Sequence, residues 1–223
     1  KNKLKIKYMK LKLNLVSKIT ALGLPGFSLQ LASSLLNATL NKSLFFYGGD
    51  IAVSGMGVIN SIQTLLLMPI IGLNQGAQPI ISFNYGAQKT DRVKETIKLA
   101  LKVATLIVVF GFIITRLFPV QLISMFNRDP QLIEFGRSGI FAWFLAFPLV
   151  GFQIVGSNFF QAIGKPKSAM FLSLTRQLIL LKPAIIIFPK FFGVKGILYA
   201  APFADFLSFL LTATFFYFGI KKL

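Results

Sequence analysis

Six long apolar runs, separated by short polar or basic turns, constrain the fold of this chain more than any other feature. They span about residues 19–46, 51–80, 97–118, 136–162, 168–189 and 197–219. A helix needs about 20 apolar residues to cross the hydrocarbon core of a bilayer, and each run is long enough. Only 13% of the 223 residues are charged, whereas a soluble domain carries roughly a quarter. The sequence therefore predicts an all-α, polytopic membrane protein built as a six-transmembrane-helix bundle.

Lysine and arginine outnumber aspartate and glutamate by 24 to 6, and the formal net charge is +18. On a soluble protein such a charge would suggest a nucleic-acid partner. Here the basic residues lie at the ends of the apolar runs, where cations anchor membrane spans and set their orientation. With six crossings both termini share one side, and that side holds 15 of the 24 cations. We therefore expect both termini in the cytoplasm and no nucleic-acid partner.

The first 18 residues form a basic lead-in with seven lysines and no acid. Basic and apolar residues alternate for too long to be a secretory signal, and no small-residue cleavage site follows. We interpret the lead-in as an amphipathic segment that lies against anionic membrane lipid, with a flexible linker as the alternative. The predicted organisation is a basic cytoplasmic segment at 1–17, a transmembrane bundle at 18–220 and a cytoplasmic tail at 221–223.

Amide and hydroxyl side chains form polar faces on four of the six expected helices. They are Gln30, Ser34, Asn37 and Asn41 in the first run; Asn60, Gln63, Asn74, Gln75 and Gln78 in the second; Gln153, Ser157 and Gln161 in the fourth; and Asp205, Ser208 and Thr212 in the sixth. Most follow spacings of three and four residues, which share one side of a helix. Hydrogen bonding between helices explains any single residue of this kind. The whole set favours a solvated cavity, because an unsatisfied polar group in hydrocarbon costs several kcal/mol.

The cations left for the membrane interior are Lys102, Arg176 and Lys182, and Asp205 is the one acid placed so deep in an apolar run. An ionisable residue inside the membrane is a functional candidate by default. Arg176 and Asp205 are at similar depths from the same side, so they can form an ion pair. Two hypotheses stay open: a fixed pair that holds the last two helices together, or a site for a proton or cation. Lys182, beside Pro183, either lines the cavity or extends toward the headgroups.

The chain contains no cysteine and no histidine. Catalytic Ser–His and Cys–His pairs and His-rich zinc sites are therefore excluded. No GxxxxGK[ST] motif is present, so we expect no ATP hydrolysis by this chain. An enzyme is not expected, and neither is any cofactor other than a coupling ion.

One stretch interrupts the second apolar run with amides, glycines and prolines: MPIIGLNQGAQPIISFNYGAQKTDRVKE at 68–95. It closely resembles the second helix and following loop in the C-terminal half of MATE-family multidrug exporters. Similar matches are GLP (23–25), LNKSLFFYGGDIAVSGMGVINSI (40–62), FFQAIGKPKSAMFLSLTRQ (159–177) and APFADFLSF (201–209). The resemblance covers essentially residues 18–220 and is greatest to the bacterial MepA-like branch.

The resemblance implies a fold and an activity that the spacing of residues does not show. Family members have two six-helix lobes that enclose a central cavity, alternate access, and export cationic, lipophilic small molecules in exchange for H⁺ or Na⁺. This chain resembles the C-terminal lobe, preceded by the inter-lobe linker at 1–17, so its expected partner is an N-terminal six-helix lobe. The expected location is the bacterial plasma membrane.

The resemblance leaves the residue roles as expectations. Asp205 is the candidate for ion coupling, and its role is inferred from its position. The cavity candidates are Gln30, Ser34, Asn37, Asn41, Asn60, Gln63, Gln75, Gln78, Gln153, Ser157, Gln161, Arg176, Lys182 and Ser208. A lipid-linked oligosaccharide flippase of the same superfamily is the alternative function, although such a flippase would be expected to carry more arginines. A non-transporting membrane subunit is a third.

Overall fold

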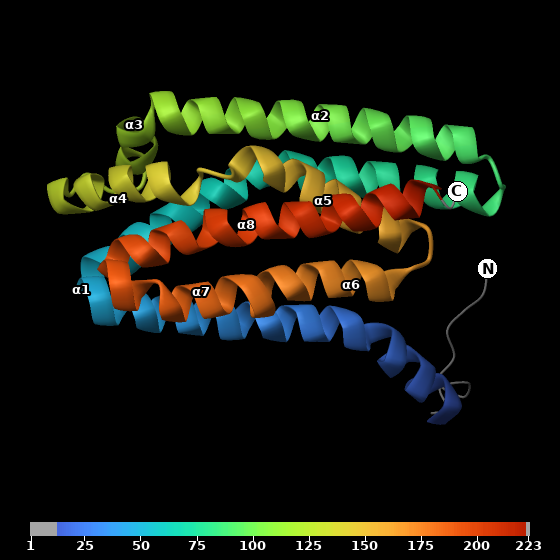
Figure 1. The fold of residues 1–223 in the computed structure, drawn as a ribbon, viewed down its shortest axis with the longest axis horizontal. Helices are drawn as coiled ribbons and strands as arrows, with labels where there is room; N and C mark the ends of the chain where they lie inside the picture. Colours follow the sequence, from blue (N-terminus) through green and yellow to red (C-terminus); the bar gives the residue numbers. More distant parts are fainter. Residues whose placement is uncertain (1–12, 222–223) are drawn as a thin grey trace, which may run out of the picture.

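The computed structural model describes residues 13–221, which are almost wholly helical (Figure 1). The elements are α1 (Leu13–Gly86), α2 (Thr90–Leu117), α3 (Pro119–Ser124), α4 (Pro130–Trp143), α5 (Phe147–Ala162), α6 (Pro166–Leu174), the π-helix η2 (Thr175–Leu181), α7 (Lys182–Ile187) and α8 (Pro189–Lys221). Most of the predicted segment at 1–17 and of the tail at 221–223 lies outside the described residues.

A single glycine turns α1 into a helical hairpin. Gly49 has φ 65° and ψ −162°, values outside the helical region, and the chain reverses direction there (Figure 1). Glycine adopts such a conformation without the steric cost that a Cβ would bring. The preceding Gly48 permits a close approach, since a Cβ there would overlap the side chains of Ala52 and Val194. The YGGD turn expected from the sequence is thus compressed into one non-helical residue.

The fourth crossing is a bent pair of helices. α4 and α5 meet at an angle of 56° across the short break that follows Trp143. Pro148 stands in the first turn of α5, where its missing N–H leaves no helical hydrogen bond unmade. The two rings at the bend, Phe144 and Phe147, contact edge to face with centroids 5.0 Å apart.

The fifth crossing runs from Pro166 to Ile187 and contains the π-helix. Pro183 follows η2 closely and cannot donate a backbone hydrogen bond to Ile179, four residues earlier and within η2. A π-helix is rare and marks a place where the regular hydrogen-bond ladder is disturbed, frequently at a functional site. The sequence predicted a membrane span at about 168–189 but no π-helix within it.

Six crossings emerge once the breaks are counted. Among residues 13–221, four helices are long and apolar enough to span a membrane, and the bent pair of α4 and α5 makes a fifth span. The reversal at Gly49 divides α1 into two crossings (Figure 1). The structure therefore confirms the predicted all-α, six-helix membrane bundle.

The connections alternate between the two ends of the bundle (Figure 1). One end holds the start of α1 at Leu13, the turn after Gly86, the α5–α6 turn and the end of α8 at Lys221. The opposite end holds Gly49, α3 and another positive-φ glycine, Gly193, with φ 58° and ψ −143°.

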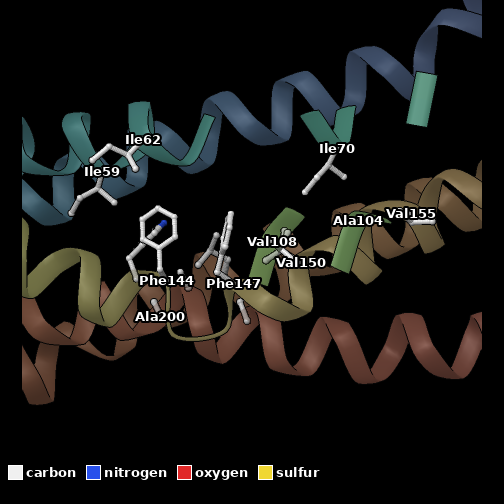
Figure 2. Packing of buried hydrophobic residues seen from close by; sticks show 14 of the residues in the cluster. Ile59, Ile62, Ile70, Ala104, Val108, Phe144, Phe147, Val150, Val155 and Ala200 are labelled. Carbon is white, nitrogen blue, oxygen red and sulfur yellow. The ribbon is translucent and has the colours of Figure 1, made fainter. Parts of the chain in front are cut away.

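The buried core lies along α5, which packs against α1, α2, α6 and α8. Figure 2 shows its side chains converging from α1, α2, α5 and α8 and from the bend between α4 and α5: Ile59, Ile62, Ile70, Ala104, Val108, Phe144, Phe147, Val150, Val155 and Ala200. Large apolar side chains such as Phe110, Leu106 and Tyr217 are exposed on the outer surface. That distribution suits a bundle surrounded by lipid.

Candidate functional site

A cavity of about 480 Å³ lies between the second half of α1, α5, α6, η2 and α8. Twelve polar or charged side chains line it: Gln63, Asn74, Gln75, Gln78, Gln153, Ser157, Asn158, Gln161, Ser173, Arg176, Gln177 and Ser208. Its apolar wall includes Leu29, Leu67, Ile71, Ile154 and Met170. A mixed lining of this kind can hold a small molecule by its apolar body and orient it by a few hydrogen bonds.

Eight of the residues proposed from the sequence come together in this cavity. They are Gln63, Gln75, Gln78, Gln153, Ser157, Gln161, Arg176 and Ser208. The second half of α1 contributes three of them and α5 another three, as the polar faces of those two runs predicted. Their role in binding a substrate stays a prediction.

The first half of α1 does not place its polar face on this cavity. Gln30, Ser34, Asn37 and Asn41 are all exposed, and among the described residues of that half only Gly26 and Leu29 line the cavity. Side-chain spacing identifies a helix face, but the packing of the bundle decides which way that face turns. The function of these four side chains stays a prediction.

Asn60 and Lys182 also lie outside the cavity lining, and both are half-buried. Lys182 follows the last residue of η2 and begins α7. The sequence left open whether Lys182 lines the cavity, and this cavity does not include it.

Several lining residues were missed by the sequence candidates. The Asn158 amide donates to the Asn74 side-chain oxygen at 3.3 Å and to its carbonyl oxygen at 3.4 Å, which joins α5 to α1. Ser33 donates to the Gln177 side-chain oxygen at 3.0 Å, which joins the first half of α1 to η2. Asn74 belongs to the amide series of its run. Asn158 lies outside the four-residue series 153, 157 and 161, and no polar series was proposed for the fifth run, which holds Gln177.

Gln63 also has a structural partner. The Trp143 indole donates from Nε1 to the Gln63 side-chain oxygen at 2.9 Å, so α4 is tied to the second half of α1. This bond is the interhelical contact expected of an isolated intramembrane amide. Gln63 therefore combines a packing role with a place on the cavity wall.

An ion pair joins η2 to α8 at the cavity wall. Arg176 Nε donates to Asp205 Oδ1 at 2.6 Å, and Gln153 donates to the Asp205 carbonyl oxygen at 2.8 Å. Asp205 is only 3% exposed, whereas 27% of the Arg176 side chain is exposed. The five other acidic residues of the chain are exposed and lie near helix ends. The structure thus forms the pair that the sequence allowed.

The π-helix positions the basic member of this pair. Arg176 is the second residue of η2 and Asp205 lies in α8. Among the described residues, the two terminal amino groups of Arg176 have no hydrogen-bond partner in the protein. In the same part of the chain, no three His, Cys, Asp or Glu side chains are grouped to hold a metal ion.

Comparison with known proteins decides the family. The family model of MatE matches residues 25–186, which includes most of the cavity lining. The chain belongs to the MatE family. The resemblance to MATE transporters stated from the sequence is confirmed, and the chain is a multi-pass membrane protein of a transporter family.

Two curated relatives and one solved structure illustrate what the MatE chain is similar to. It is 27% identical over 191 residues to the FAD transporter of Shewanella oneidensis, covering 86% of this chain and 42% of the relative. It is 24% identical over 205 residues to the multidrug export protein MepA of Staphylococcus aureus strain MSSA476, covering 92% and 45%. The structure of the MATE multidrug transporter DinF-BH superposes with a TM-score of 0.81 at 37% identity, covering 96% and 48%.

The MatE chain thus spans about half the length of the curated relatives it matches. Its cavity is formed entirely by residues of this one lobe-sized bundle.

Proposed function

We propose that this MatE chain is the C-terminal six-helix lobe of a secondary active exporter of lipophilic small molecules, which exchanges them for H⁺ or Na⁺ by alternating access. The observation that carries the proposal is the amide-lined cavity with a buried ion pair on its wall. A buried acid can exchange a proton or bind a sodium ion, and either event changes the charge balance beside the cavity.

The exposed polar face of the first half of α1 supports an N-terminal lobe as partner. Gln30, Ser34, Asn37 and Asn41 lie on a membrane-spanning helix and are exposed. Contact with lipid hydrocarbon would leave their amides and hydroxyl without hydrogen bonds, at a cost of several kcal/mol. A second lobe across a shared, hydrated cavity removes that cost. Cationic, lipophilic compounds are the substrates proposed for the assembled transporter.

The distribution of basic residues supports a location and an orientation in the membrane. Five basic residues lie at the end of the bundle where α1 begins and α8 ends: Lys89, Arg92, Lys165, Lys167 and Lys221. Basic residues concentrate on the cytoplasmic side of bacterial membrane proteins. We propose that this end faces the cytoplasm from the bacterial plasma membrane, with anionic lipid around it. The curated relatives reported above are named as transporters and exporters, so the flippase and subunit alternatives are not favoured.

Ethidium efflux from cells that express the whole natural protein tests the proposal. Efflux should collapse with a protonophore if the coupling ion is H⁺, or with a sodium ionophore if it is Na⁺. Asp205→Asn should uncouple efflux from that gradient, because a neutral amide has no negative charge that a bound H⁺ or Na⁺ could neutralise. Glu134→Gln is the matched control, since Glu134 is an exposed acid on α4 outside the cavity. An inserted, folded protein that exports nothing would contradict the proposal.

A further inference from the structure

Arg176 is the one charged side chain that lines the cavity within the part of the chain that the structure describes. The remaining polar lining consists of neutral amides and hydroxyls, and no carboxylate is among them. A cationic group of a substrate therefore meets no carboxylate among these lining side chains. A group that accepts hydrogen bonds meets an abundance of donors.

The hydrogen bonding of Arg176 leaves its most useful donors free. A guanidinium carries five N–H groups, one on Nε and four on the two terminal nitrogens. The Nε group is used by Asp205, and no contact of the two terminal nitrogens is recorded among the described residues. Two parallel N–H donors on a planar fork match the two oxygens of a carboxylate or phosphate.

The surroundings suit such a group. Ser173 lies one helical turn before Arg176, Ser208 lies one turn after Asp205, and both line the same cavity. Their hydroxyls can donate further hydrogen bonds to an oxygen anion. Ile154 and Met170 supply apolar wall for the rest of a ligand. Asp205 compensates the charge of Arg176, so the empty site carries no unpaired cation that would be costly in the membrane.

We propose that the Arg176 fork is a specificity site, which recognises a carboxylate or other oxygen anion on a lipophilic substrate that also carries a cationic group. This inference rests on the proposed function, because it assigns the substrate group that this lobe binds. Asp205 then acts as a counterion that weakens anion binding at Arg176, and removing the charge of Asp205 strengthens that binding. A purely structural ion pair predicts no such effect.

A matched pair of dyes tests the site directly. Tetramethylrhodamine as the free acid and as its methyl ester differ by one ionised carboxylate. Binding of each is measured by fluorescence polarisation to the whole natural protein in lipid nanodiscs. We expect the wild type to bind the acid about tenfold more tightly than the ester. That ratio of dissociation constants is what one pair of charge-assisted hydrogen bonds contributes.

Two variants shift that ratio in opposite directions. Arg176→Lys keeps the charge but removes the fork, and should lower the acid-to-ester preference about tenfold. Asp205→Asn keeps an oxygen that can accept from Arg176 Nε but leaves the positive charge of Arg176 uncompensated. This variant should raise the acid-to-ester preference several-fold. Arg137→Lys, an exposed arginine of α4 outside the cavity, is the matched control. Thermal unfolding of each variant verifies that it is folded.

The dye-binding ratios and the efflux measurement distinguish the specificity site from the proposed exporter. A wild type without preference for the acid, or variants that change stability while the ratio stays constant, would overturn the specificity site. Ester binding and efflux without acid preference would overturn it and leave the proposed exporter standing. A folded protein that binds neither dye and exports nothing would contradict both proposals.

Discussion

At the scale of single residues, the stability of the lobe depends on keeping Arg176 and Asp205 together. Asp205 is nearly fully buried, whereas Arg176 is partly exposed on the cavity side. Losing the partner of a buried charge is more costly than losing the pair, because the charge that remains has given up its hydration.

Arg176→Gln should therefore lower the free energy of unfolding by about 3 kcal/mol, near the lower end for a broken buried pair because Arg176 keeps some solvent contact. The double variant Arg176→Gln with Asp205→Asn should recover most of that loss. Thermal unfolding in detergent, followed by intrinsic fluorescence of Trp143, measures both. A double variant that unfolds as early as the single one would show that the pair contributes little.

Residue-scale prediction from the sequence was strongest where an unusual residue stood in an apolar run. Asp205 and Arg176 were identifiable because both are charged and lie at similar depth, and the structure joins them. Asn158 was missed because it neighbours Ser157 and falls outside the four-residue spacing. Its importance comes from a contact with Asn74, 84 positions away, and no local pattern records such a contact.

At the scale of elements, glycine determines where the helices can turn back. The α7–α8 connection brings Gly196 so close to Phe188 that a Cβ at 196 would overlap the Phe188 carbonyl oxygen and approach Pro189 N at 2.9 Å. The atoms in the way belong to the backbone, so no side-chain rotation relieves the overlap.

Gly196→Ala should lower the free energy of unfolding by about 3 kcal/mol, because overpacking against backbone forces the turn to shift. Gly57→Ala is the matched control, since a Cβ at that helical position meets nothing within 4 Å, and alanine favours a helix by about 1 kcal/mol over glycine. Thermal unfolding temperatures of the two variants compare the effects. Equal stability of the two alanine variants would refute the close approach.

The elements also show where the sequence was insufficient. Apolar length predicted six helices, and six crossings are present. The π-helix escaped prediction, since Pro183 is visible in the sequence but the packing of η2 against α8 is not. The break between α4 and α5 escaped for a similar reason. Pro148 suggests a bend, but the 56° angle is set by how the two halves pack.

At the scale of the whole molecule, the connections define two ends, and the absence of cysteine in all 223 residues makes their sides measurable. Ala87→Cys places a thiol in the turn between α1 and α2, and Asn127→Cys places one between α3 and α4. We expect a membrane-impermeant maleimide to label position 127 in intact cells and position 87 only after permeabilisation. The parent without the introduced cysteines is the control, and the reverse labelling would invert the proposed orientation.

The sequence predicted the whole molecule better than it predicted the site. Alternation of apolar runs and basic turns is enough to specify a multi-pass bundle, because the bilayer imposes the same length on every crossing. The site depends on which polar face turns inward. The faces of α5 and of the second half of α1 turn toward the cavity, whereas Gln30 and Asn37 of the first half are exposed.

The glycine reversals at Gly49 and Gly193 have a consequence for the bilayer itself. Each takes a single non-helical residue, so neither hairpin holds slack that could lengthen when the surrounding membrane thickens. A hairpin without such slack accommodates a thicker or thinner hydrocarbon core by tilting as one body or by deforming the lipid around it, at fractions of a kcal/mol per Å of mismatch. The acyl-chain length of a reconstitution lipid therefore acts on both crossings of each hairpin at once.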